Sequence, residues 1–70
     1  MTVYECMGML GRHEKVTILT ARGKKKIAER LSAYEYEKYS DEILREVFDA
    51  ILKNTAVSVD LEKMIIYCEE

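Results

Sequence analysis

The chain has 70 residues, which leaves room for one small hydrophobic core and little else. Hydrophobic residues make up 49% of it and charged residues 34%, with no proline and three glycines, so collagen-like, low-complexity and linker-rich architectures are excluded. The formal net charge is −2, but residues 12–30 are basic and residues 31–70 are acidic. These segments either attract each other or present a charged surface to a partner. We expect one domain over residues 1–70.

Residues 2–11 have the pattern of a short helix with both ends marked. Thr2 and Glu5 form the T-x-x-E capping box, and Gly11 suits the left-handed position after a helix. One apolar stripe at helical spacing consists of Val3, Cys6, Met7 and Leu10. A helix this short must pack against another element to be stable.

A β-strand is predicted over residues 15–21, where β-branched residues alternate, and the turn Arg22-Gly23 follows it. Residues 24–39 are compatible with two structures. Ile27 and Leu31 alternate with their neighbours as in the second strand of a hairpin, but they also have helical spacing.

Residues 43–53 are equally ambiguous, because their apolar positions fit a helix and residues 47–52 also fit a strand. Residues 56–61 alternate cleanly and predict a strand. Residues 64–68 form a continuous apolar run of strand length, and residues 60–63 can turn the chain between the two strands.

The order of these elements resembles small uncharacterised proteins of phages and mobile elements of Gram-positive bacteria. Those proteins open with a V-x-E-x-x-x-x-L helix and a V-x-I strand, and they close with an I-L-x-x-x-V-x-x-I strand and a V-x-V-x-L strand. The corresponding stretches are Val3 to Leu10, Val16 to Ile18, Ile43 to Ile51, in which the valine is Val47 and stands one position earlier than in the pattern, and Val57 to Leu61. The resemblance implies strands at residues 45–52 and 24–31, and no activity comes with it.

Together these patterns predict an α+β domain, with a short N-terminal helix packed on an antiparallel sheet of three to four strands. The alternative is a helix-rich fold with a C-terminal β-hairpin. The core is expected to contain Val3, Met7, Leu10, Val16, Ile18, Ile27, Leu31, Leu44, Val47, Phe48, Ile51, Val57, Val59 and Ile65.

The sequence contains no arrangement typical of a catalytic or metal site. His13 is the only histidine and lies in a polar turn, and no spacing of histidines and cysteines matches a metal-binding motif. We therefore expect neither enzymatic activity nor a cofactor. Cys6 and Cys68 are expected to be reduced thiols in the cytoplasm, since no signal peptide or membrane-spanning run is recognisable.

Two segments are candidates for binding a partner. The first has tyrosines alternating with acids, and it consists of Tyr34, Glu35, Tyr36, Glu37, Tyr39 and Asp41. Tyrosines are enriched at protein interfaces, and acidic neighbours would suit a basic protein surface. The alternative is that one or two of these tyrosines complete the core.

The second candidate is the basic run after the predicted first strand, formed by Arg22, Lys24, Lys25, Lys26 and Arg30. Such a run could contact nucleic-acid phosphates. Against this, the net charge of −2 is unusual for a nucleic-acid module, and no aromatic residue lies within the run. A solvated hairpin tip is the simpler interpretation.

The leading hypothesis is a non-enzymatic protein-binding module of phage or mobile-element type, for example a small inhibitor of a host defence protein. The alternative is a small DNA-binding regulator that uses residues 22–30. A third hypothesis is a homodimer that pairs through an exposed edge strand such as residues 64–68.

Overall fold

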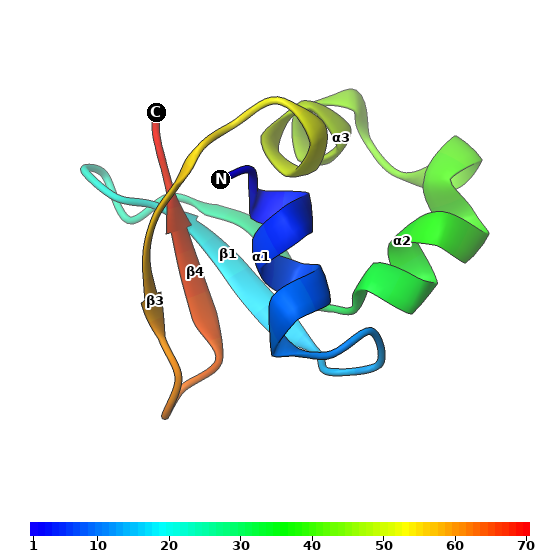
Figure 1. The fold of residues 1–70 in the computed structure, drawn as a ribbon. Coiled ribbons are helices and arrows are strands. Elements are labelled where there is room, and N and C mark those ends of the chain that lie inside the picture. Colours follow the sequence, from blue (N-terminus) through cyan, green and yellow to red (C-terminus); the bar gives the residue numbers. More distant parts are fainter.

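A computed structural model describes residues 1–70 and shows three helices beside a four-stranded sheet (Figure 1). The elements in chain order are α1 (Val3–Leu10), β1 (Val16–Thr20), β2 (Lys26–Leu31), α2 (Ala33–Tyr39), the 3-10 turn η1 (Ser40–Glu42), α3 (Arg45–Leu52), β3 (Ala56–Asp60) and β4 (Ile65–Cys68). The predicted α+β class is confirmed, and so is the short helix at the N-terminal end.

Helix α1 has the two end structures that its sequence predicts. The Glu5 amide donates to Thr2 Oγ1 at 3.1 Å, and the Thr2 amide donates to Glu5 Oε1 at 2.9 Å. Gly11 ends the helix with a φ of 133°, and its amide donates to the Met7 carbonyl at 3.2 Å. Val3, Cys6 and Met7 are buried, so the apolar stripe docks α1 onto the sheet.

Residues 26–31 form a strand that pairs with β1 in an antiparallel hairpin, as the resemblance implied. The Thr20 side chain stabilises the turn, because its Oγ1 accepts a hydrogen bond from the Lys25 amide at 3.0 Å. The pairing has two register shifts, and Arg30 takes a φ of 53°. Strand β2 is therefore an irregular edge of the sheet.

The sheet has the order β2-β1-β4-β3. Strand β4 pairs antiparallel with β3 but parallel with β1, so the sheet is mixed, and the expectation of a wholly antiparallel sheet is wrong for the β1–β4 pair. Residues 64–68 were expected to offer an exposed edge, but β4 occupies a central position between two neighbours. The free edges belong to β2 and β3.

Residues 45–52 form helix α3, which corrects the strand that the resemblance implied. The helix buries Ala50 and Ile51 and leaves Asp49 near Arg45 and Lys53 at 3.9 and 3.8 Å. In a strand, side chains two positions apart lie on the same face, so the Asp49 carboxylate would share the buried face of Ile51. Burying that unpaired charge is costly, so the helical arrangement is favoured.

The core lies between the helices and one side of the sheet (Figure 1). Its most buried members are Val3, Cys6, Met7, Val16, Ile18, Ala33, Tyr36, Ile51, Ile66 and Cys68. Two residues predicted for the core are instead exposed: Leu44 by 75% and Val57 by 54%. Ile65 also lies outside the core, because it alternates with the buried Ile66 and faces away from the helices.

Candidate interaction surfaces

The structure divides the tyrosine segment between core and surface. Tyr36 is only 6% exposed, and its ring packs 5.4 Å from that of Tyr4 and 5.8 Å from that of Phe48. Burial raises the pKa of Tyr36. Tyr34 and Tyr39 remain 38% and 44% exposed on α2. The core interpretation therefore holds for Tyr36, and only the other two tyrosines are available to a partner.

Two of the three predicted acids of this segment are already paired within the chain. Glu37 Oε2 lies 2.7 Å from Arg12 Nη2, and its other oxygen accepts a hydrogen bond from the Tyr4 hydroxyl, which raises the pKa of Tyr4. Glu35 lies 3.7 Å from Lys15 Nζ. Asp41 is exposed in η1 and has no ion-pair partner. The segment therefore presents less negative charge than its sequence indicates.

The exposed tyrosines are instead accompanied by cations. Lys38 Nζ lies 5.9 Å from the Tyr34 ring centroid and 5.3 Å from that of Tyr39, and a contact with the Tyr39 hydroxyl raises the pKa of Lys38. The His13 ring packs on Tyr34 with centroids 4.8 Å apart. We call Tyr34, Lys38 and Tyr39 the tyrosine strip.

The basic segment points in several directions rather than forming one surface. Lys25 Nζ is 2.5 Å from Glu46 of α3, an ion pair that raises the pKa of Lys25, and Lys26 lies 3.3 Å from Glu29. Lys24 lies over the Tyr67 ring at 4.3 Å.

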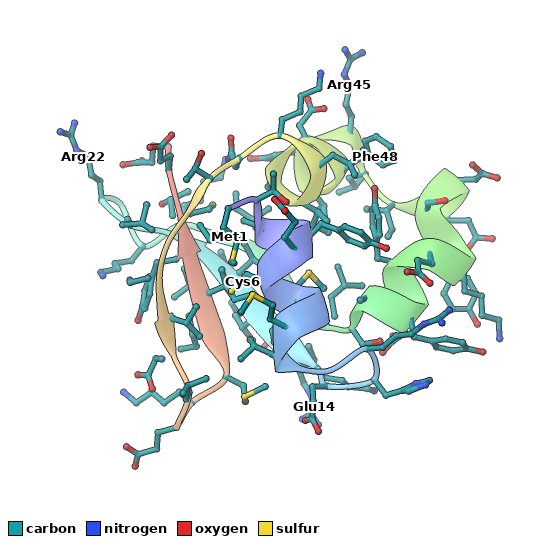
Figure 2. All side chains as sticks on the ribbon, viewed as in Figure 1. Met1, Cys6, Glu14, Arg22, Arg45 and Phe48 are labelled. Carbon is teal, nitrogen blue, oxygen red and sulfur yellow. The ribbon has the colours of Figure 1, made fainter.

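Arg22 projects from the tip of the β1–β2 hairpin, away from the helices (Figure 2). Arg30, on the irregular edge strand, has no ion-pair partner. This division leaves no continuous row of cations along which a nucleic-acid backbone could run.

A third surface, which the sequence patterns did not predict, lies on the side of the sheet that no helix covers (Figure 1). Thr17 and Leu19 of β1 stand in register with Ile65 and Tyr67 of β4, so all four side chains share that side. They are half-buried and do not belong to the core cluster. We call these four residues the open face. The apolar run 64–68 could have indicated this surface, because a strand with apolar side chains on both faces needs another element packed against each face.

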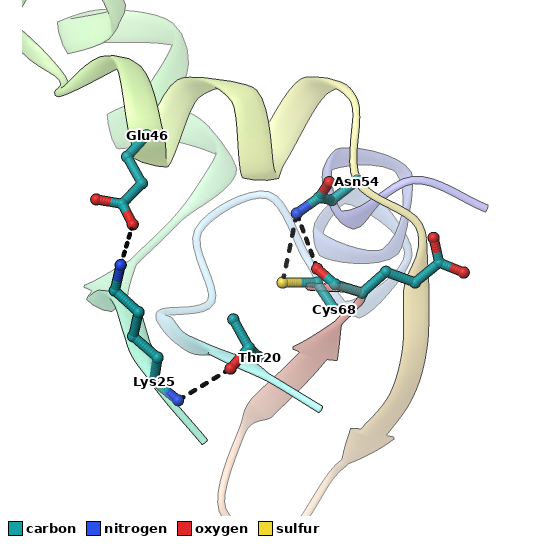
Figure 3. A network of polar contacts seen from close by, with 6 residues as sticks. Thr20, Lys25, Glu46, Asn54 and Cys68 are labelled. Atoms are coloured by element: carbon teal, nitrogen blue, oxygen red, sulfur yellow. Dashed lines mark hydrogen bonds and ion pairs between the residues drawn. The ribbon is translucent and has the colours of Figure 1, made fainter. Parts of the chain in front are cut away.

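Polar contacts join the hairpin turn to the first turn of α3, through Lys25 and Glu46, and join Asn54, just after α3, to the end of β4 (Figure 3). Asn54 Nδ2 donates to the Glu69 carbonyl at 3.0 Å and lies 3.8 Å from Cys68 Sγ. An open groove of about 330 Å³ adjoins this network, and its acidic lining residues are Glu46, Asp49, Glu69 and Glu70. No group of three or more histidine, cysteine or acidic residues is arranged to hold a metal ion.

Both cysteines are free thiols, and both are buried. Burial raises the pKa of Cys6 and of Cys68, so each thiol keeps its proton at neutral pH. Because the thiolate is the nucleophilic form, neither cysteine is activated for attack. The structure assigns them to packing.

No protein family, curated protein or solved structure matches this chain. The resemblance to phage proteins therefore stays a prediction based on apolar spacing. None of the three helices has the length and apolar character needed to cross a bilayer. A proposal about function must therefore start from the exposed residues of the surfaces described above.

Proposed function

We propose that this chain is a non-enzymatic protein-binding module that contacts its partner through the tyrosine strip. The supporting observation is that Tyr34 and Tyr39 are 38% and 44% exposed on a helix whose third tyrosine is fixed in the core. Tyrosine side chains provide a large contact area with few rotatable bonds, so they make strong interface anchors. A small inhibitor of a host defence protein is the specific form that the phage resemblance suggests.

The surroundings of the strip extend the surface and determine its charge. Leu44, which is 75% exposed just before α3, adds an apolar side chain beyond η1. Asp41 and Lys38 contribute one unpaired charge of each sign, whereas Glu35 and Glu37 are satisfied within the chain. We therefore propose a partner surface of mixed charge rather than the uniformly basic surface that the sequence suggested.

The test is affinity capture from a bacterial lysate, followed by mass spectrometry and a binding titration with the captured protein. The double variant Tyr34→Ala with Tyr39→Ala should bind at least about tenfold more weakly, since interface tyrosines commonly contribute more than about 1 kcal/mol each. The matched control is Leu61→Ala, because Leu61 is 66% exposed in the β3–β4 turn. This control should bind like the unmodified chain.

Equal capture by the double variant and the unmodified chain would contradict the proposal. The DNA-binding alternative makes a different prediction, namely binding to duplex DNA that weakens steeply with salt and that Lys24→Glu reduces. Observing that behaviour without a protein partner would replace the proposed function.

A further inference from the structure

The open face has apolar side chains at its centre and opposite charges at two of its corners. Lys26 of edge strand β2 pairs with Leu19, and Leu19 stands beside Tyr67. In the next row of side chains, Thr17 stands beside Ile65, which pairs with Asp60 of edge strand β3. Lys26 and Asp60 therefore lie at opposite edges of the sheet, with the apolar residues between them.

We propose that the open face binds a second copy of this chain, sheet against sheet, in a two-fold symmetric dimer. The proposal does not depend on the tyrosine strip, which lies on a helix on the other side of the sheet (Figure 1). Isologous dimers need a patch that is complementary to itself. The open face meets that condition through the opposite charges of Lys26 and Asp60 at its two edges.

The charge argument follows from the symmetry. When two copies face each other across a two-fold axis that lies in the interface and runs perpendicular to the line from Lys26 to Asp60, each Lys26 meets the Asp60 of the other copy. The centres of the two faces then meet, the two Lys26 side chains stay apart from each other, and so do the two Asp60 side chains. Opposite charges placed across an interface fix its register, whereas like charges in contact cost several kcal/mol.

A nucleic acid fits this face less well than a second copy does. Lys24 lies over Tyr67, and this pair could contact a nucleotide, with the lysine near a phosphate and the tyrosine ring against a base. However, Asp60 stands at the opposite corner, and Glu69 and Glu70 share a groove with Arg22 at the end of the sheet. Phosphates would meet these carboxylates. The mixture of signs is typical of a protein interface with a polar rim.

The size of the face sets the expected strength. Four strands about 4.8 Å apart, each about five residues of 3.3 Å long, give a face of about 300 Å² in each copy. A contact of that size falls among small, transient interfaces. We therefore expect a dimer with a dissociation constant of roughly tens of micromolar.

Analytical ultracentrifugation of the full chain between about 10 µM and 1 mM tests the proposal, because this range spans the expected dissociation constant. The average mass should rise from one chain to two. Tyr67→Glu places a charge at the centre of the interface and should weaken dimerisation at least tenfold. Met9→Glu, which introduces the same charge at a position of α1 that is 74% exposed, should leave dimerisation unchanged. Circular dichroism confirms that both variants are folded.

A double-mutant cycle tests the contact between copies. Lys26 and Asp60 lie three strand spacings, about 14 Å, apart within one chain, where their substitutions should act independently. Asp60→Asn keeps the side-chain oxygen that accepts hydrogen bonds from the Glu62 and Lys63 amides, both at 3.1 Å. Lys26→Glu should weaken the dimer several-fold alone and much less in the Asp60→Asn background. This cycle stays informative if Tyr67→Glu fails to fold.

Four results would overturn the proposal. The chain could stay monomeric over the whole range, or Lys26→Glu could have the same effect in both backgrounds. A dimer that survives Tyr67→Glu but is lost in Val57→Pro would show pairing through the β3 edge instead. Finally, a titration in which the monomer binds a single-stranded oligothymidylate, and Tyr67→Glu does not, would assign the open face to nucleic acid.

Discussion

Arg12 Nη2 lies 2.7 Å from Glu37 Oε2, so one ion pair joins the turn after α1 to helix α2 across 25 positions of the sequence. The same carboxylate accepts a hydrogen bond from the Tyr4 hydroxyl. The Glu37 carboxylate thus connects α1, the turn after α1 and α2. Because it is paired within the chain, the acidic segment has less unpaired negative charge than its sequence suggests. The pair is partly exposed, so it positions α2 more than it stabilises the fold.

Tyr36 and Tyr34 should respond very differently to truncation. Tyr36→Ala removes a ring packed between Tyr4 and Phe48 and should lower the free energy of unfolding by about 3 to 5 kcal/mol. Tyr34→Ala, at a position 38% exposed, should cost less than about 1 kcal/mol. Urea denaturation followed by circular dichroism measures both. Similar losses for the two variants would contradict the division of the segment into core and surface.

Two glycines three positions apart, Gly8 within α1 and Gly11 just after its end, should have opposite effects when replaced by alanine. Gly8 lies in the interior of α1, and a Cβ there would meet nothing within 4 Å, so Gly8→Ala should stabilise the chain by about 1 kcal/mol. Gly11 has a φ of 133°, and its Cβ would lie 2.7 Å from Glu14 Cγ. Gly11→Ala should cost about 1 to 3 kcal/mol. Thermal unfolding of both variants tests the pair, and a stabilised Gly11→Ala would show that the helix ends differently.

Burial predicts the effect of shortening two apolar side chains, Ile51 within α3 and Leu44 just before it. Ile51 is fully buried, so Ile51→Ala should cost about 2 to 5 kcal/mol. Leu44 is 75% exposed, and Leu44→Ala should change stability by no more than about 0.5 kcal/mol. Chemical denaturation at one temperature compares them. A large loss from Leu44→Ala would indicate the core that the sequence predicted rather than the one described above.

Alkaline conditions should destabilise the fold. Burial raises the pKa of the Cys6 and Cys68 thiols, so they keep their protons in the folded chain, while an unfolded thiol ionises from about pH 8.5. Unfolding then releases protons, and the free energy of unfolding falls as pH rises through and beyond that value. The raised pKa values of Tyr4 and Tyr36 extend the fall above pH 10.

Urea denaturation at about pH 7, 9 and 10 measures this dependence. Replacing a buried thiol in Cys6→Ala should flatten the slope between neutral pH and pH 9, although the variant starts from a lower stability. A slope that is identical with and without Cys6 would mean that the thiol ionises equally in the folded and unfolded chains.

Much of the fold could be predicted wherever one local signal dominates. The capping box of Thr2 and Glu5, the hairpin turn at Gly23 and the strand predicted within residues 56–61 each depend on a few neighbouring residues, and each appears in the structure. Residues 45–52 could not be assigned, because the apolar spacing around Ile51 suits both a helix and a strand. The position of Asp49 separates the two, since only a helix turns that carboxylate toward solvent.

The interaction surfaces were harder to predict, because exposure depends on contacts between distant segments. Tyr34 and Tyr36 are equivalent in sequence pattern, yet two positions on a helix are about 200° apart, and the packing of Tyr4 and Phe48 decides which one is buried. The open face depends on β4 lying beside β1, a parallel pairing across 48 positions that no local pattern encodes, as Thr17 and Ile65 illustrate.

The central position of β4 also affects when the chain can fold during its synthesis. Strands β1 and β3 do not touch each other in the sheet; each pairs with β4, which is the last strand to be made. A ribosome-bound chain that ends before Ile65 can form the β1–β2 hairpin, but β3 then has no partner strand and a gap separates it from β1. The hairpin and the helices can form early, but the apolar side chains on both sides of that gap stay exposed until residues 65–68 emerge. The sheet is therefore completed only after residues 65–68 have left the ribosome, because both β1 and β3 need them as a partner.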